Sequence, residues 1–483
     1  MKTKPMKHQK VGVKRLGAAP EFFALGCEQG TGKTWMLLAD AERQFKAGEI
    51  DALFVIAPKG VHVNWALREI PAHLEIPHKV EYWLSGAGIK HQRKLDRLLT
   101  HNREDGLVIV TMNVDAVNTK TGFNYAKKFL KVHRSMIVVD ESQRIKNPAA
   151  KRTQRILELR DLSKSRRISS GTLVADSPID LFAQYEFLSD GLLGTTSYRA
   201  FIAEFSELLP AGHPLVEEIR TRNHLRGVPQ VVKKDEMGRP VYRNLEKLSK
   251  LMSPHTYRVL KKDCLDLPDK IYQSQYFELE PVQRKIYDQV KSEMRWERED
   301  GDIDTFTALT MINKLQQLTS GFILVDGQST ELANATPRLA ALKEVIEDTA
   351  GQIIIWARFR AEIERIVKEL RSKYNVVQYH GGTPQSERDA AVDAFQLGEA
   401  RIFIANPAAG GTGLTLTAAS TVIYYSCSFS LEERVQSEDR AHRIGTHHPV
   451  IYVDLIARDT IDERIAAALQ AKAGVATEIM DAL

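Results

Sequence analysis

A glycine-rich turn followed by a lysine and a threonine is the first part of the chain that can do chemistry. Residues 28–34 read Glu-Gln-Gly-Thr-Gly-Lys-Thr, come after the apolar run Phe22–Leu25 and precede a helical pattern. Backbone amides of such a turn bind phosphate, the lysine reaches the β- and γ-phosphates, and the threonine hydroxyl ligates Mg²⁺. Cys27 stands where the strict pattern has glycine, and a glycine-rich turn with a surface lysine is the alternative interpretation. The pattern predicts a nucleotide-phosphate site made by Gly30, Thr31, Gly32, Lys33 and Thr34.

Two acidic residues end a second apolar run. Asp140 and Glu141 follow Met136–Val139, and this position at the end of a buried strand suits an NTPase. We expect Asp140 to hold Mg²⁺ through water and Glu141 to orient and deprotonate the attacking water. A helix cap has the same pattern, but its combination with the phosphate turn favours hydrolysis. The turn 169–172, Ser-Ser-Gly-Thr, is a further candidate for sensing the γ-phosphate.

Arg440 and Arg443 lie three residues apart and therefore on one face of a predicted helix. Two guanidinium groups placed in this way can stabilise the charge that develops on a transferring phosphoryl group. A solvated helix in which these arginines pair with Glu438 and Asp439 is the alternative.

Short β-branched runs separated by helical patterns predict the scaffold that positions these residues. Near-continuous apolar runs suit strands buried on both faces, as in the parallel sheets of α/β doubly wound folds. The alternation fades between about residues 190 and 270. We therefore expect a first lobe at 1–190, a mostly helical insertion at 190–270 and a second lobe at 270–483. The runs that predict strands include Leu53–Ala57, Leu107–Val110, Met136–Val139, Ile353–Trp356, Val376–Val377, Arg401–Ala405, Thr421–Tyr425 and Val450–Val453.

Composition narrows the class of protein. The chain has 483 residues, of which 43% are hydrophobic and 27% charged, so a disordered or fibrous protein is excluded. The polar N-terminus, the lack of an apolar run long enough to span a bilayer and three widely spaced cysteines predict a soluble protein of a reducing compartment. The net charge of +5 permits a nucleic-acid partner without requiring one.

The order of these motifs resembles that of superfamily-two nucleic-acid motors, and more closely that of Swi/Snf-type DNA translocases. Three departures from the family pattern are Gln143 for a histidine, Leu173 for a proline and Thr446 for a glutamine. The matching segments are the Gln9 element, 57–65 (motif Ia), 110–111 (motif Ib), 140–147 (motif II), 170–173 (motif III), 410–417 (motif V) and 436–445 (motif VI).

The resemblance implies two RecA-like lobes with ATP in the cleft, DNA across both and Mg²⁺ as the metal. It adds Gln9, Gly411 and Gly413 to the nucleotide-binding residues, and Gln436 to the catalytic arginines. It also implies phosphate contacts to nucleic acid from Lys59, Thr111, Lys146, Gly411 and Thr412. Residues 144–167 are rich in Lys and Arg, with only Glu158 and Asp161 opposing them, which fits sequence-independent DNA binding or else a solvated helix surface.

The resulting hypothesis is an ATP-dependent DNA translocase that acts mainly on duplex DNA as a monomer. We expect it in the cytoplasm of a bacterium or a phage-infected cell, associated with the nucleoid. Two alternatives stay open: a helicase that separates DNA or RNA strands, and a nucleic-acid clamp that uses ATP without productive hydrolysis.

Overall fold

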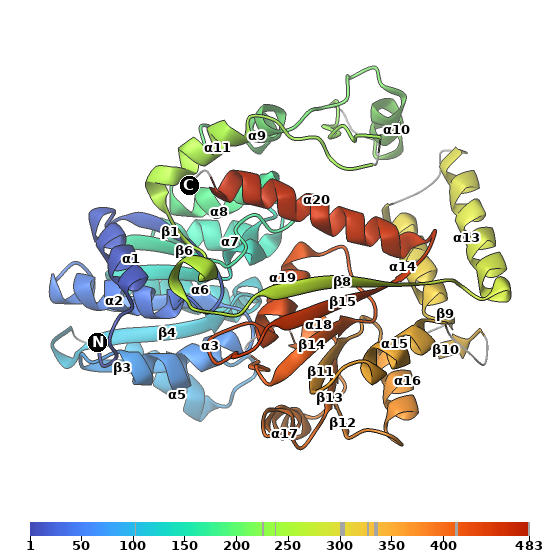
Figure 1. Ribbon diagram of the computed structural model, residues 1–483. Coiled ribbons are helices and arrows are strands. Elements are labelled where there is room, and N and C mark those ends of the chain that lie inside the picture. Colours follow the sequence, from blue (N-terminus) through green and yellow to red (C-terminus); the bar gives the residue numbers. More distant parts are fainter. Residues whose placement is uncertain are drawn as a thin grey trace. The chain divides into compact units, whose positions relative to one another are not determined.

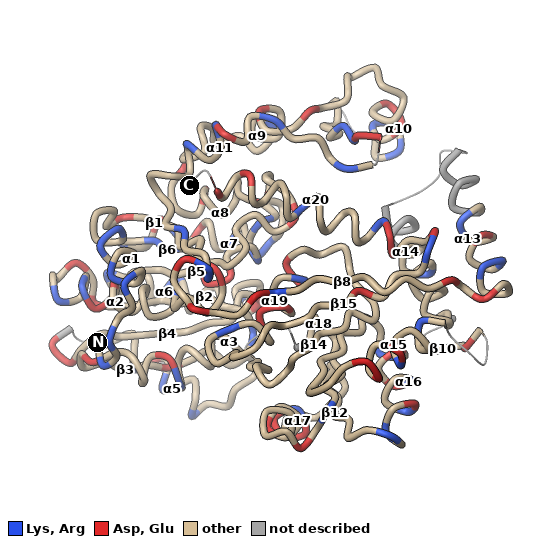
Figure 2. The backbone as a smooth tube through the Cα atoms, viewed as in Figure 1, with Lys and Arg blue, Asp and Glu red and all other residues tan. Residues whose placement is uncertain are grey.

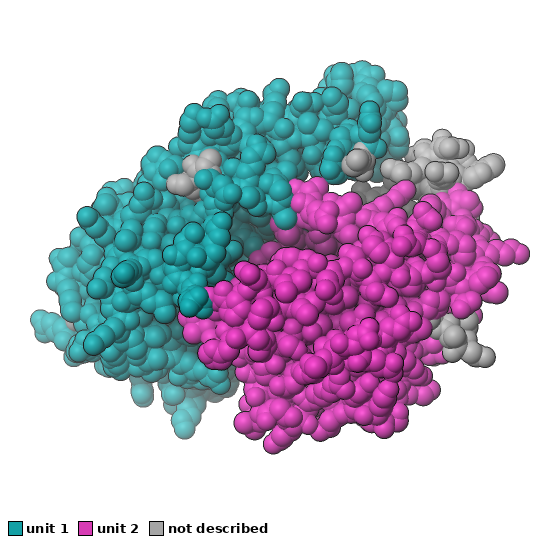
Figure 3. Space-filling model, in the orientation of Figure 1, with its two compact units in different colours: residues 1–266, 472–483 teal, residues 267–471 magenta. Residues whose placement is uncertain are grey.

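A computed structural model describes residues 1–101, 103–224, 227–236, 238–299, 305–325, 328–332, 337–410 and 414–481. The chain divides into two compact units (Figures 1 and 3). Unit 1 comprises residues 1–266 and 472–483, and unit 2 comprises residues 267–471. Each unit is built on its own parallel sheet.

Unit 1 contains a seven-stranded sheet in the order β3-β4-β2-β5-β6-β1-β7, and every neighbouring pair is parallel. The continuous apolar runs make the central strands, because a strand covered on both faces has no solvent side for polar residues. All six residues of β2, for example, are buried. The strands are β1 (Phe22–Cys27), β2 (Ala52–Ala57), β3 (His78–Tyr82), β4 (Leu107–Asn113), β5 (Ser135–Asp140), β6 (Ser165–Ser169) and β7 (Thr256–Val259).

Helices cover both faces of this sheet. Leu53 and Val55 of β2 point into one core with Leu16 and Met36, while Phe54 points into the other core. The helices are α1 (Lys7–Ala18), α2 (Lys33–Lys46), α3 (Val61–Asn64), a π-helical turn (Trp65–Glu69), α4 (Ile70–His73), α5 (Ile89–Leu98), α6 (Lys120–Val132), α7 (Lys151–Arg160), α8 (Leu181–Leu188), α9 (Tyr198–Phe205), α10 (Pro214–Arg222), α11 (Leu245–Met252) and α12 (Lys261–Cys264).

The segment 190–270 lies almost entirely within unit 1. It holds α9, α10 and α11, and antiparallel bridges join Ser206 to Tyr242, Leu208 to Val232 and Lys234 to Pro240. Its strand β7 pairs with β1 and completes the sheet of unit 1. The division of the chain at 190 and 270 stays a prediction.

Unit 2 has a six-stranded parallel sheet in the order β12-β13-β11-β14-β15-β8 and an antiparallel β9-β10 ribbon. Its strands are β8 (Lys270–Phe277), β9 (Phe322–Val325), β10 (Gln328–Glu331), β11 (Gln352–Trp356), β12 (Val376–Tyr379), β13 (Ile402–Ala405), β14 (Ala419–Tyr424) and β15 (Val450–Ala457). Its helices are α13 (Pro281–Glu299), α14 (Thr305–Thr319), α15 (Pro337–Glu347), α16 (Arg360–Leu370), α17 (Gln385–Gln396), α18 (Pro407–Gly410), α19 (Leu431–Ala441) and α20 (Ile461–Asp481), whose last residues belong to unit 1.

The fold is therefore α/β with two doubly wound parallel-sheet lobes, which confirms the predicted fold class. No helix among the described residues is both long and apolar enough to cross a membrane.

Candidate functional site

The phosphate-binding turn lies between β1 and α2. Gly30 and Gly32 both have a φ of 82°, a left-handed backbone conformation that residues with a Cβ rarely adopt. The Lys33 amine donates to the carbonyl oxygens of Cys27 at 2.9 Å and Glu28 at 3.3 Å. A Cβ on Gly32 would lie 2.0 Å from Nε2 of Gln9, so an alanine here would also displace the Gln9 side chain.

Gln9 and His8 fasten α1 to the same turn. Gln9 accepts from the backbone N–H of Met6 at 2.8 Å and donates to the carbonyl of Thr31 at 3.4 Å, and His8 Nε2 lies 2.7 Å from the same oxygen. A hollow beside them is lined by Met6, Lys7, His8 and residues 262–266. The structure thus places Gln9 against the phosphate turn, and its role in binding the nucleotide stays a prediction.

Asp140 is held by three hydrogen-bond donors at the end of β5. The Trp65 indole donates to Oδ2 at 2.9 Å, while the Ser169 hydroxyl at 2.6 Å and the Glu141 N–H at 3.1 Å donate to Oδ1. Carboxyl ends of neighbouring parallel strands meet at one edge of a sheet, which brings Cys27, Asp140 and Ser169 to the same edge. Sequence reasoning placed Asp140 correctly at a strand end but missed Trp65.

Glu141 adopts a φ of 52°, an unusual conformation for a residue with a side chain. Its carboxylate accepts from the side-chain amide nitrogen of Gln143 at 2.7 Å. The side-chain oxygen of Gln143 in turn accepts from the Ser170 hydroxyl at 2.6 Å. The Thr172 N–H donates to that hydroxyl at 2.9 Å. Gln143, where the family pattern has histidine, therefore links the predicted catalytic base to the turn at residues 169–172.

The donor chemistry of this edge fits Mg²⁺. The cation prefers oxygen ligands, and the Thr34 hydroxyl at the start of α2 and the Asp140 carboxylate at the end of β5 are of that kind. The turn at residues 169–172 lies close to the phosphate turn. A Cβ on Gly171 would be 3.7 Å from the Lys33 amine and 2.9 Å from the Gln29 side chain. Thr34 and Asp140 are thus the residues that would hold the metal.

Of the predicted arginine pair in unit 2, Arg440 lies in the last turn of α19, whereas Arg443 follows the helix, which ends at Ala441, so the two do not share one helical face as expected. Arg440 and Arg443 both donate to the carbonyl of Leu414, at 3.3 and 3.2 Å, and Arg443 also donates to the Thr415 hydroxyl at 3.0 Å. Arg440 further donates to the carbonyl of Gln436 at 2.8 Å and is only 5% exposed, so the helix is not a solvated one at this point. Gly411, Thr412 and Gly413, predicted to contact nucleotide or nucleic acid, lie outside the described residues.

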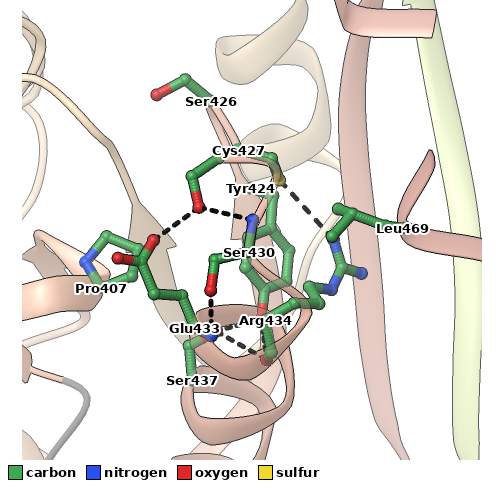
Figure 4. A pocket seen from close by; sticks show the side chains of 10 residues that line it. Pro407, Tyr424, Ser426, Cys427, Ser430, Glu433, Arg434, Ser437 and Leu469 are labelled. Carbon is green, nitrogen blue, oxygen red and sulfur yellow. Dashed lines mark hydrogen bonds between the residues drawn. The ribbon is translucent and has the colours of Figure 1, made fainter. Parts of the chain in front are cut away.

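A buried ionic network fixes α19, and sequence reasoning missed it. Arg434 pairs with Glu438 at 2.7 Å and with Asp454 at 2.5 Å, and it points toward the sulfur of Cys427 (Figure 4). Lys270 of β8 pairs with Glu438 at 3.0 Å. Burial acts to raise the pKa of Glu438, but the positive charges of Lys270 and Arg434 outweigh it and hold that pKa below its ordinary value. The network joins the predicted arginine helix to β8 and β15.

The residues predicted to contact nucleic acid differ in their surroundings. Lys59 is exposed at the end of β2, beside Gly60 with a φ of 87°. Lys146 pairs with Asp176 at 2.6 Å and with Asp180 at 3.4 Å. Burial acts to lower the pKa of Lys146, but the two carboxylates raise it above its ordinary value. Lys146 stays a predicted contact, with part of its charge already balanced.

Thr111 requires a correction. The residue has no exposed surface, because its hydroxyl donates to the carbonyl of His62 at 2.7 Å beneath α3. This side chain cannot contact a DNA phosphate in the structure described, and its role there is to fix the start of α3.

The basic stretch 144–167 is only partly exposed. Arg167 has no exposed surface and pairs with Asp40 at 2.9 Å, while Arg155 bonds to the backbone carbonyl of Val117 and Arg160 to that of Glu186 in α8. Figure 2 shows Lys and Arg interspersed with Asp and Glu over both units. The basic side chains of this stretch that are exposed are Arg144, Lys151 and Lys164.

Comparison with known families identifies the class. The SNF2-related domain matches residues 23–321, more than half of the chain, and the helicase conserved C-terminal domain matches residues 337–445. The chain belongs to the SNF2-related family, and it is a helicase-like ATPase of that family.

Its relatives are longer proteins. The chain is 25% identical to the TATA-binding protein-associated factor BTAF1 of Arabidopsis thaliana, with all of this chain and 26% of that protein covered. It is 27% identical to the putative ATP-dependent helicase/translocase YwqA of Bacillus subtilis, with 74% of this chain and 37% of that protein covered. The Sulfolobus solfataricus SWI2/SNF2 ATPase core, solved in complex with dsDNA, shares 24% identity at a TM-score of 0.42, with 99% and 93% of the two chains covered. The chain thus spans well under half the length of BTAF1 and of YwqA.

Proposed function

We propose that the protein is an ATP-dependent DNA translocase that moves along mainly double-stranded DNA and remodels DNA structures or displaces bound proteins. The observation that carries the proposal is the sheet edge of unit 1, where the phosphate turn lies beside Asp140 and the chain Glu141–Gln143–Ser170. Translocation is supported by the name of one relative, an ATP-dependent helicase/translocase, and the exposed Lys59 is available for contact with a DNA phosphate.

The chemistry follows from the residues of each unit. Lys33 and the amides of the turn bind the β- and γ-phosphates, and Glu141, oriented by Gln143, accepts a proton from the attacking water. Bound Mg²⁺ supplies charge neutralisation on the phosphate oxygens. A role for Arg440 and Arg443 of unit 2 in stabilising the charge on the transferring phosphoryl group stays a prediction.

ATP hydrolysis in the presence of DNA tests the proposal. Lys33→Ala removes the phosphate-binding amine and should abolish DNA-stimulated phosphate release. Glu141→Gln should retain ATP binding and hydrolyse at least about 100-fold more slowly, the lower end of what a general base contributes. Lys46→Ala is the matched control for Lys33→Ala. Lys46 lies on the same helix, α2, but is exposed and paired with Glu42, so this variant should behave as the unmodified protein. ATP binding without phosphate release at saturating DNA would instead support the nucleic-acid clamp.

A second candidate, a strand-separating helicase, is favoured by one observation. Residues 231–236 and 238–242 pair in antiparallel fashion in unit 1, through backbone bonds between Asp235 and Arg239 and between Lys233 and Val241. Such a hairpin can divide two strands of a duplex. An unwinding assay on a tailed duplex discriminates: strand separation that is lost when residues 234–239 are replaced by a Gly-Ser turn would favour the helicase.

A further inference from the structure

The helix that follows β2 contains an unusual turn. Trp65–Glu69 is π-helical, between α3 and α4, and the N–H of Ile70 donates to the carbonyl of Trp65. Pro71 has no N–H to continue the ordinary α-helical pattern, which accounts for the wider turn just before it. Single π-helical turns recur at functional sites because they alter the direction of one side chain.

The side chain at this turn reaches the metal carboxylate. Trp65 is 1% exposed, and its indole N–H, the only polar group of the side chain, donates to Oδ2 of Asp140 at 2.9 Å. Ser169 and the Glu141 N–H occupy the other oxygen. The orientation of Asp140 therefore depends on a donor that belongs to the helix after β2.

The start of the same helix carries the exposed Lys59. His62, in the first turn, is anchored on both sides: Nε2 lies 3.1 Å from the carbonyl oxygen of Trp83, and its own carbonyl accepts from Thr111 at 2.7 Å. Lys59 and Gly60 thus directly precede α3, and Trp65, which directly follows α3, bonds to Asp140.

We propose that Trp65 is a positioning residue that couples phosphate contact at Lys59 to the orientation of Asp140, and so makes metal binding depend on bound DNA. The inference rests on the proposed function for the identity of the partner at Lys59. The bond between Trp65 and Asp140 does not depend on it. A phenylalanine fills most of the same space but cannot donate to the carboxylate.

Trp65→Phe tests the bond, with Trp83→Phe as the matched control. The Trp83 indole is also buried, and its nitrogen has no hydrogen-bond partner among the described residues, so the control removes the same N–H without removing a bond. The readout is the Mg²⁺ concentration that gives half-maximal binding of a fluorescent ADP, measured without hydrolysis. Loss of a group that orients a metal ligand typically weakens metal affinity about 10- to 100-fold, so Trp65→Phe should raise this concentration about tenfold and Trp83→Phe should leave it unchanged. Equal values for the two variants would overturn the proposal.

Lys59→Ala tests the coupling and keeps the inference open to refutation if Trp65→Phe does not fold. Duplex DNA should lower the half-saturating Mg²⁺ concentration of the unmodified protein several-fold, and Lys59→Ala should remove that effect. An undiminished DNA effect in Lys59→Ala would refute the coupling. Absence of any DNA effect in the unmodified protein would refute the coupling and count against DNA as the partner, whereas the Trp65–Asp140 bond is still decided by the DNA-free measurement.

Discussion

Replacing Arg167 by methionine should destabilise unit 1 strongly without weakening DNA binding by the folded protein. Arg167 lies in the basic stretch that favoured nucleic-acid contact, yet it is fully buried and bonded to Asp40, which is also fully buried. Its guanidinium further donates to the carbonyls of Arg166 and Pro20. The substitution therefore separates a structural role from a DNA-binding role.

The magnitude follows from the geometry of the pair. At 2.9 Å and an effective dielectric constant of about 20, the attraction between the two charges is about 6 kcal/mol. Burial lowers the pKa of Arg167, and Asp40 offsets that effect only in part. Removing one partner of a buried pair costs about 3–5 kcal/mol because the other charge stays uncompensated. In the variant, Asp40 still accepts hydrogen bonds from Arg43 at 2.8 Å and Gln44 at 2.9 Å. We therefore expect the free energy of unfolding to fall by about 3 kcal/mol, the lower end of that range.

Urea unfolding followed by circular dichroism measures this change, and DNA affinity is measured at a temperature where the variant is folded. The double variant Asp40→Leu/Arg167→Met removes both charges and should recover much of the lost stability, because no charge is then left unpaired. A loss below about 1 kcal/mol for Arg167→Met, the range of an exposed pair, would refute the reasoning. A large fall in DNA affinity of the folded variant would do so as well.

Three further predictions concern the site of unit 1. Gln143→Glu places a second carboxylate against Glu141, which should slow hydrolysis at least tenfold and move the acidic limb of the pH–rate profile to higher pH; an unchanged profile would mean that Gln143 does not orient Glu141. Gly32→Ala should abolish ATP binding and cost about 1–2 kcal/mol of stability, because its φ is 82° and a Cβ would meet Gln9; normal binding by the variant would contradict the described turn. Burial, helped by Lys59, lowers the pKa of His62 below 6.5 despite its carbonyl neighbours, so the unfolded chain binds more protons and stability should fall as pH drops below about 6.5. Urea midpoints at pH 7.5, 6.5 and 5.5 should show this slope, and a His62→Gln variant with the same slope would argue against the assignment.

Much of the fold was predictable because buried parallel strands have a simple signature. Continuous apolar runs such as Leu53–Ala57 and Ile353–Trp356 correspond to β2 and β11. β7, by contrast, was not predicted: its four residues carry no apolar run, and its place in the sheet of unit 1 depends on pairing with β1, distant in sequence. Short strands of this kind are specified by tertiary contacts.

The candidate site shows the same division. Lys33, Asp140 and Glu141 are recognisable because their chemistry depends on local spacing and on the strand or turn that carries them. The bond from Trp65 to Asp140 joins residues 75 positions apart, and no local pattern reports it. Counting charges also misled the prediction for Arg167, since a sequence does not show which arginines are buried with an acidic partner.

The central claim, that the chain is a motor driven by ATP along duplex DNA, is tested most directly by its ATPase rate with duplex DNA, single-stranded DNA and RNA measured side by side. We expect duplex DNA to stimulate phosphate release most strongly, and we expect Lys33→Ala to lose that stimulation. Stimulation by RNA alone, or the same rate with and without any nucleic acid, would contradict the account.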